Sequence, residues 1–318
     1  MEPLNLLASA IISFAAGWAF LPWLISSLRG TSLVGRDLNK LERPLVPEMG
    51  GVGVILGFYV GVATLAVVAY EEIPGSVYFA ALSAALGAGI VGLLDDMFRL
   101  RKRSKAVLPF VLSLPLGAAV YATGNRILFG ADVGLLIALA VPLGVTSAAN
   151  ASNMLEGFNG LGAGLGVIMT ASLITLSMLT GAREGLFLLF PLLGALLAFL
   201  WFNRYPARVF PGDSMTLFSG ATLACAAIIS TPPLKTFGAI LFIPMIIEFI
   251  LKARGRFQGE NYGVVGEDGR LSWTGRTESL AHAIMKWRRL KEWEVVAILW
   301  SLEALLSMIV IVAVLVIG

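Results

Sequence analysis

Apolar residues recur along this chain in long stretches that short polar segments separate. A mostly apolar stretch of about 20 residues is long enough to cross the hydrocarbon core of a bilayer as an α-helix. The pattern predicts an all-α integral membrane protein, a single polytopic domain over 1–318 with about ten transmembrane helices. The expected spans are 4–28, 49–70, 76–94, 106–123, 127–148, 159–180, 184–202, 214–231, 234–251 and 295–317.

Composition supports a membrane location. The 318 residues are 58% hydrophobic and only 14% charged, whereas an ordinary soluble domain carries about 25% charged residues. The mean hydropathy is +0.86. The single cysteine, Cys225, lies in an apolar stretch, which excludes a disulfide framework and a thiolate metal site. The first span follows no basic segment, so we expect it to be retained rather than cleaved as a signal peptide.

Lys and Arg are distributed unevenly between alternate gaps. If the N-terminus is outside, 20 of the 23 basic residues lie in cytoplasmic gaps, and only Arg126, Arg183 and Lys235 lie outside. The positive-inside rule then puts both termini on the non-cytoplasmic side. The cytoplasmic gaps are also the longer and more polar ones, so the active site is expected on the cytoplasmic face.

The last cytoplasmic gap, 252–294, is the one gap long enough to hold structure of its own. Within it, Asp268 and Gly269 lie between short arms in which apolar residues alternate, which predicts a β-hairpin turn. We expect this gap to form a small element that covers the substrate.

Two adjacent carboxylates, Asp95 and Asp96, close the third predicted span and precede the basic segment that contains Lys105. One interpretation is a solvated helix end whose acids offset the basic neighbours. The other is an acid pair that binds a divalent cation or accepts a proton, beside a lysine that holds phosphate. These residues alone leave both interpretations open.

Three asparagines form a second polar group. Asn150 and Asn153 are three residues apart, so they should project from one face of a helix end. Their neutral amides can ligate a hard cation or hydrogen-bond a base. Asn159 follows among glycines that allow a ligand to approach the backbone closely. Helix capping would explain one or two of these residues but not all three together with Glu156 at membrane depth.

Further acids lie in other cytoplasmic gaps. Asp213 begins the eighth span, where it could cap the helix or bind a metal, and both roles stay open. The first cytoplasmic gap contains Asp37, Lys40 and Glu48 before a glycine-rich helix start. Acids for a metal, cations for phosphates and asparagines for a base, all on one predicted face, fit phosphoryl transfer between a nucleotide and a lipid.

Four segments carry a family resemblance: GRDLNK with PEMGG, GLLDDMFRLRKRSK, NASNMLEGFNGL and YPARVFPGDS, in this order over about residues 35–220. They resemble the polyprenyl-phosphate N-acetylhexosamine-1-phosphate transferase superfamily, most closely its eukaryotic and archaeal branch of UDP-N-acetylglucosamine dolichyl-phosphate N-acetylglucosamine-1-phosphotransferases. The resemblance implies ten helices, a cytoplasmic active site and Mg²⁺, with Mn²⁺ as a substitute. The implied reaction transfers N-acetylglucosamine-1-phosphate from a UDP-sugar to a polyprenyl or dolichyl phosphate and releases UMP, as the first step of lipid-linked glycan assembly.

Matched residue by residue, the resemblance also implies roles for individual side chains. These are metal binding by Asn153 and Asp213, a reaction centre of Asp95, Asp96 and Lys105, uridine binding by Asn150 and Asn159, and a place beside the site for Glu48.

The last cytoplasmic gap departs from both branches of the superfamily. The bacterial cell-wall translocases carry a histidine cluster there, whereas this chain has one histidine, His282, which argues against a cell-wall substrate. The eukaryotic enzymes carry an HRIPR-like segment for the diphosphate. Here Arg254 and Arg256 are the arginines expected to bind substrate in its place.

The sequence also leaves two other classes of protein to consider, a transporter and a regulator. A secondary transporter should place ionisable groups near the bilayer midplane, but nearly all of them lie at one face here, and Glu248 and Glu303 have no assigned role. A nucleotide-sugar-binding regulator would tolerate loss of the acid pair. The expected partners are a UDP-sugar, a polyprenyl phosphate and the membrane, without nucleic acid; a homodimer and a phospho-enzyme intermediate are left open.

Overall fold

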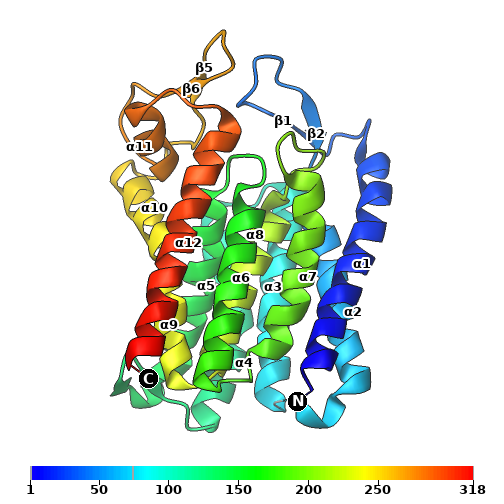
Figure 1. The fold of residues 1–318 in the computed structure, drawn as a ribbon, viewed down its shortest axis with the longest axis vertical. Coiled ribbons are helices and arrows are strands. Elements are labelled where there is room, and N and C mark those ends of the chain that lie inside the picture. Colours follow the sequence, from blue (N-terminus) through cyan, green and yellow to red (C-terminus); the bar gives the residue numbers. More distant parts are fainter. Residues whose placement is uncertain (1, 74, 318) are drawn as a thin grey trace.

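The chain folds as an upright bundle of long helices, with the longer loops at one end (Figure 1). The computed structural model describes residues 2–73 and 75–317. Within that part, nine helices are long and apolar enough to cross a membrane. They are α1 (Pro3–Leu28), α2 (Gly51–Val68), α3 (Ser76–Phe98), α4 (Lys102–Ala122), α5 (Ile137–Leu155), α6 (Leu161–Thr180), α7 (Leu186–Asn203), α8 (Gly212–Ile229) and α12 (Glu292–Ile317).

Two short helices in series make a tenth crossing. α9 (Pro232–Leu241) and α10 (Ile243–Arg254) meet at Phe242 with a bend of 51°, and together they are apolar enough to count as one broken span. Pro244, in the first turn of α10, has no N–H, and its ring would clash with the carbonyl four residues earlier. One straight helix therefore cannot continue through this point. The prediction of about ten membrane helices is confirmed when the pair counts as one.

α5 differs most from its predicted span. The sequence predicts a span over 127–148 with Asn150 and Asn153 at the helix end, but residues 127–132 form a β-hairpin, and α5 begins at Ile137 and continues to Leu155. The predicted bounds were wrong because residues 127–132 pair as two short strands, and because the polar residues after 148 remain helical inside the bundle, where α5 packs against α4 and α8.

Three antiparallel hairpins of two strands each complete the described part of the chain. The predicted hairpin is confirmed: β5 (Val264–Val265) pairs with β6 (Leu271–Ser272), and Gly269 has the left-handed φ of +69° that the tight turn requires. The other two hairpins were not predicted. The remaining short elements are β1 (Val34–Arg36), β2 (Leu45–Pro47), η1 (Tyr70–Glu72), β3 (Ile127–Leu128), β4 (Ala131–Asp132), η2 (Gly134–Leu136) and α11 (Leu280–Trp287).

α8 is the most enclosed of these helices, with 83% of its span buried. Glycines of α2 and α3 contact its first turn directly. A Cβ on Gly51 would lie 2.2 Å from the backbone nitrogen of Met215, and a Cβ on Gly92 would lie 2.3 Å from the backbone carbonyl oxygen of Asp213. Only glycine allows backbones to approach this closely. The start of α8, and Asp213 with it, is therefore fixed against α2 and α3.

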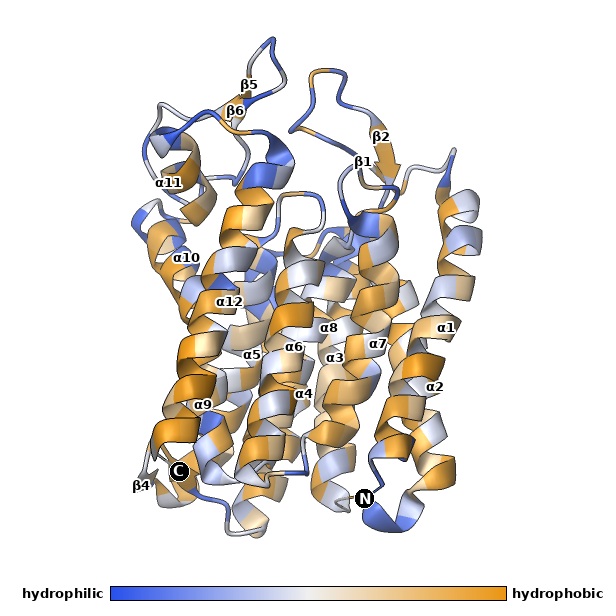
Figure 2. Ribbon diagram, in the orientation of Figure 1, coloured by the Kyte–Doolittle hydropathy of each residue, from blue (hydrophilic) through white to orange (hydrophobic). Residues whose placement is uncertain are grey.

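Hydropathy divides the molecule along its long axis (Figure 2). The helices are mostly apolar, whereas the loops around β1, β2, β5 and β6 are mostly hydrophilic. We call this loop-rich end the polar end, and the 20 basic residues of the predicted cytoplasmic gaps all lie toward it. The loops of the polar end are 29–50, 99–101, 156–160, 204–211 and 255–291. Every predicted site residue lies in one of these loops or within two helical turns of one.

Candidate active site

Three charged side chains from three helices meet at the polar end. Lys105, in the first turn of α4, donates to Asp95 Oδ2 at 2.9 Å and also contacts Asp213 Oδ2. Asp95 Oδ1 accepts a further bond from the Leu100 N–H at 2.7 Å. The side chains of Asp95, Lys105 and Asp213 are 14%, 23% and 22% exposed, so a ligand can reach them. The geometry brings Asp95 and Lys105 together as predicted and adds Asp213 to them.

Asp96 makes different contacts from Asp95. Its carboxylate accepts from the backbone N–H groups of Asp213 at 2.6 Å and Ser214 at 3.1 Å, at the start of α8. The residue that precedes the helix, Pro211, provides no side-chain cap, so Asp96 supplies the cap from another helix. The sequence left open whether Asp213 is itself the cap. That role belongs to Asp96, and both oxygens of Asp213 face other groups.

Asn153 connects α5 to this centre. Its Nδ2 donates to Asp213 Oδ1 at 2.7 Å and to Thr216 Oγ1 at 2.9 Å. Asn150, one turn earlier, donates to the carbonyls of Thr146 at 2.9 Å and Lys105 at 3.3 Å. The two asparagines therefore share the face that their spacing predicts, and Asn150 holds the backbone of α4 where Lys105 begins to project.

The donor atoms at Asp213 and Asn153 fit Mg²⁺. Both side chains carry oxygen, the ligand atom that this ion prefers, and the oxygen of the Asn153 amide is not used in the bonds just described. In the described ranges, no group of three or more His, Cys, Asp or Glu could hold a metal. A protein-only cage is not needed, because Mg²⁺ is commonly held by one or two side chains together with water and substrate phosphates.

Asn159 belongs to a second, separate cluster of buried polar side chains. Its backbone N–H donates to Glu292 Oε1 at 2.8 Å, and its Nδ2 donates to Asp37 Oδ2 at 3.0 Å. Lys40 contacts Asp37 and lies 3.3 Å from Glu292 Oε2. The structure thus does not bring Asn159 into contact with Asn150. Glu292 was not predicted from the sequence, because an acid near the start of a helix is ordinarily explained by the helix dipole.

Glu48, which follows β2, lies beside the group formed by Asp95, Lys105 and Asp213. Burial raises the pKa of Glu48, the nearby Arg99 opposes that shift, and the charge of Asp213 adds to it. Glu48 therefore lies within electrostatic range of Asp213, next to the site as the resemblance implies. Gly35 on the paired strand allows this position, since a Cβ there would meet Glu48 Oε1 at 2.2 Å.

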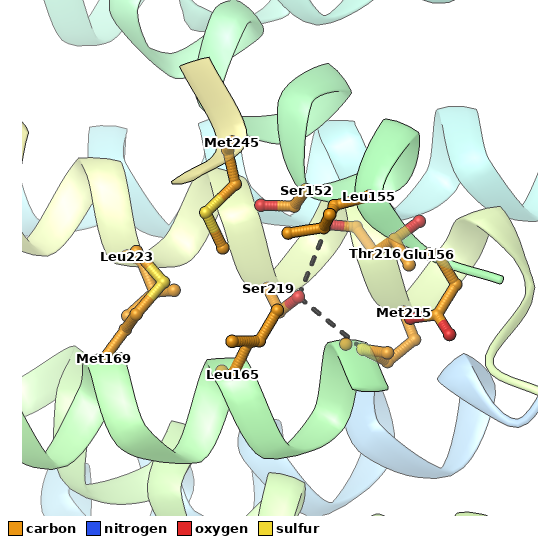
Figure 3. Close-up of a pocket in the computed structure, with 12 residues that line it drawn as sticks. Ser152, Leu155, Glu156, Leu165, Met169, Met215, Thr216, Ser219, Leu223 and Met245 are labelled. Atoms are coloured by element: carbon orange, nitrogen blue, oxygen red, sulfur yellow. Dashed lines mark hydrogen bonds between the residues drawn. The ribbon is translucent and has the colours of Figure 1, made fainter. Parts of the chain in front are cut away.

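A small cavity of about 10 Å³ is lined by residues of α5, α6, α8 and α10, together with Glu156 just after α5 (Figure 3). Thr216, Ser219 and Glu156 are among its lining residues, and Thr216 is also the partner of Asn153. Glu156 Oε2 is buried without a hydrogen-bond partner in the described part of the chain. Burial raises the pKa of Glu156 to about 7.

Replacing Glu156 by Gln should remove a pH-dependent loss of stability. A carboxyl whose pKa rises on folding from 4.5 to about 7 stabilises the fold fully below pH 4.5, and this contribution is lost as the pH rises through 7. The shift corresponds to roughly 3 kcal/mol. Between about pH 5 and about pH 8, the unfolding temperature in detergent should fall more for the wild type than for Glu156→Gln. Equal slopes would contradict this prediction.

Arg254 and Arg256 lie at the polar end and are exposed. Within the described part of the chain, neither side chain contacts Asp95, Lys105 or Asp213. Arg256 and Phe257 have φ angles of +54° and +56°, a conformation uncommon outside glycine. The Phe257 carbonyl accepts from Lys102 Nζ at 3.0 Å. This bond attaches the loop to α4 three residues before Lys105, so Arg256 lies on a segment next to the centre.

The structure explains one of the two acids that the sequence left without a role. Glu248 Oε2 accepts from Ser279 Oγ at 3.2 Å and from the Leu280 N–H at 2.8 Å, so it caps α11 and attaches it to α10. Glu303, in α12, is fully buried, and neither of its carboxyl oxygens has a partner among the described residues. Nothing in the structure explains Glu303.

Comparison with known proteins gives consistent similarities. Residues 78–231 match the family model described as glycosyl transferase family 4. The chain is 38% identical to a Saccharolobus solfataricus protein, over 98% of each chain, whose name is provisionally UDP-N-acetylglucosamine–dolichyl-phosphate N-acetylglucosaminephosphotransferase. It is 30% identical to the Dictyostelium discoideum protein of that name, over 76% of this chain and 71% of the relative. It is 26% identical to the phospho-N-acetylmuramoyl-pentapeptide-transferase of Shouchella clausii, over 82% and 86% of the two chains.

Proposed function

The chain belongs to glycosyl transferase family 4, and we propose that it transfers N-acetylglucosamine-1-phosphate from UDP-N-acetylglucosamine to a dolichyl or other polyprenyl phosphate. UMP is the second product, and the lipid-linked sugar is the starting point for glycan assembly. The observation that carries the proposal is the ammonium of Lys105 between Asp95 and Asp213, with Asn153 bonded to Asp213. This arrangement offers a cation for phosphates and oxygen ligands for a metal at one end of a membrane bundle.

The reaction is a single displacement at phosphorus. An oxygen of the lipid phosphate attacks the β-phosphorus of the UDP-sugar, the bond from that phosphorus to the bridging oxygen breaks, and its electron pair leaves with UMP. Lys105 binds the phosphate oxygens on which negative charge gathers. Asp95 orients Lys105 through its 2.9 Å bond, and Asp96 orients Asp213 through the start of α8.

Asp213 and Asn153 are the residues that would hold Mg²⁺, or Mn²⁺ in its place. When bound, the metal supplies positive charge that offsets the diphosphate and the leaving UMP. The oxygen-only donor set and the reachable position of Asp213 support this assignment.

The remaining predicted residues are assigned to the two substrates. We assign Asn150 and Asn159 to binding the uridine. Glu48 is assigned a place beside the phosphate that is transferred. Arg254 and Arg256 are assigned to binding the diphosphate. The Lys102 bond to the loop of Arg256 supports that last role, because it attaches the loop to the helix of the reaction centre. The loop 255–291, with its hairpin and α11, then covers the bound substrates.

We place the polar end on the cytoplasmic face and the start of α1 and end of α12 on the other face. The 20 basic residues toward the polar end support this orientation. A transporter would be expected to line its midplane with ionisable groups, whereas the clustered charges described here lie at one end.

Removal of divalent metal should abolish turnover. Purified protein would be incubated with UDP-N-acetylglucosamine, a polyprenyl phosphate and Mg²⁺, and UMP and lipid-linked sugar would be measured. Excess EDTA should lower the rate by about 10³-fold or more, and added Mg²⁺ or Mn²⁺ should restore it. Full activity in excess chelator would remove the metal role of Asp213 and Asn153. Absence of any product with Mg²⁺ present would refute the proposed reaction.

A further inference from the structure

Both hydrogens of the Asn159 side-chain amide are directed at carboxylates. Nδ2 lies 3.0 Å from Asp37 Oδ2 and 3.5 Å from Glu292 Oε2, and the backbone N–H of Asn159 donates to Glu292 Oε1 at 2.8 Å. The three residues are buried, with 4%, 3% and 3% of their surface exposed. Water therefore does not compete for these bonds.

The surroundings fix which end of the amide faces the acids. An amide has one end that only donates and one that only accepts, whereas carboxylate oxygens accept. A flipped amide would set its oxygen against Asp37 and Glu292 and lose the bonds to both. Lys40 contacts both carboxylates and supplies their counter-charge. The orientation of the Asn159 amide thus follows from the chemistry of its neighbours.

The other end of that amide, Oδ1, accepts no hydrogen bond from any residue in 2–73 or 75–317. We propose that Asp37 and Glu292 convert Asn159 into a group that can only accept, so that the ligand atom facing it must be a donor, such as the N3–H of uracil. The inference rests on the proposed function, in which the ligand is a uridine nucleotide placed at Asn159. Glu292 acts through Asn159 and is a positioning residue.

This arrangement would set base specificity. Uracil carries a hydrogen on N3, whereas cytosine has a lone pair there, so a fixed acceptor attracts the first base and repels the second. A polar site that is left without its partner discriminates strongly against the wrong ligand, because the unpaired group has already lost its water. An amide that was free to flip could serve either base and would discriminate less.

The fixed amide also joins distant parts of the chain. Asp37 comes from the first loop, Asn159 from the turn between α5 and α6, and Glu292 from the first turn of α12. Asn39 strengthens the same junction, since its Nδ2 donates to the Gly157 carbonyl at 2.8 Å. The recognition group is therefore assembled only when these three segments are docked.

The test is calorimetric binding of UMP and CMP to the purified, full-length protein in detergent. The variants are Glu292→Gln, which keeps the shape but adds a donor beside Asn159, and the double variant Asp37→Asn with Glu292→Gln. The matched control is Glu294→Gln, since Glu294 lies on the same helix, is 28% exposed and contacts Lys291 and Arg270 instead.

The wild type should bind UMP at least tenfold more tightly than CMP, roughly 1.4 kcal/mol or more. The ratio should fall about threefold in Glu292→Gln and about tenfold in the double variant, while Glu294→Gln keeps the wild-type ratio. Turnover with UDP-N-acetylglucosamine should show a raised KM in Glu292→Gln with kcat nearly unchanged, because the reaction centre is separate.

Unchanged UMP-to-CMP ratios in both variants would overturn the inference while leaving the proposed function intact. If the variants fail to fold, N3-methyluridine monophosphate tests the same point on the wild type, since it lacks the donor. Binding equal to that of UMP would also overturn the inference. A wild type that binds neither UMP nor UDP-N-acetylglucosamine would instead refute the proposed function.

Discussion

Asp213→Asn is expected to lower the rate of UMP formation by about 10³-fold while costing only about 1 kcal/mol of stability. The two oxygens of Asp213 face two donors, Asn153 Nδ2 at 2.7 Å and the ammonium of Lys105. An asparagine has one acceptor end, so its amino group would point at one of these donors, and the charge that attracts a metal would be lost. The cap of α8 survives, because it comes from Asp96.

The measurement is turnover beside the unfolding temperature for each variant. Asp132→Asn is the matched control, since Asp132 lies toward the opposite end of the bundle and binds the Gly134 N–H. Asp96→Ala should show a different balance, with a loss of about 1–2 kcal/mol in stability because α8 loses its cap. Activity of Asp213→Asn within a few-fold of wild type would show that Asp213 is not a functional ligand.

Lys105→Ala should have an effect of similar size on kcat. The ammonium of Lys105 is the only positive charge that contacts Asp95 and Asp213 among the described residues. Without it, the two carboxylates repel each other and also repel the phosphates of both substrates. A group that stabilises charge in the transition state typically contributes about 3–4 kcal/mol, so we expect a loss of roughly 10²–10³-fold in kcat.

Arg103→Ala is the control, because it also removes one positive charge from the first turn of α4, but its side chain is exposed. This variant should stay within about 0.5 kcal/mol of wild type in stability and close to it in rate. Binding of UDP-N-acetylglucosamine should be measured for both variants, since a transition-state role predicts that kcat falls more than affinity. If Lys105→Ala and Arg103→Ala have the same rate, the charged residues at the polar end are solvated surface rather than a reaction centre.

Features that depend on a local pattern could be predicted from the sequence. Spans follow from the lengths of apolar stretches, and the hairpin at Gly269 follows from turn residues between alternating arms. The pairing of Asp95 with Lys105 was also predictable, because the two residues are only ten positions apart around one short turn. The placement of Asn150 and Asn153 on one helix face follows from their spacing.

Features that depend on contacts between distant segments required the tertiary structure. Sequence could not separate Asp95 from Asp96, since their roles differ only because the start of α8 lies against Asp96. Nor could it separate Asn159 from Asn150, because the partner of Asn159 is 133 positions away at Glu292.

The physical reason is that hydropathy and turn chemistry act over one helix or one turn, whereas a polar side chain takes its role from whichever group is buried beside it. In this chain, that neighbour is set by close backbone contacts such as those of Gly51 and Gly92 with α8. The sequence therefore determined the number and type of the elements and which polar residues lie toward one end. Packing of the bundle decided which acid caps a helix, which contacts the lysine, and which holds an amide in place.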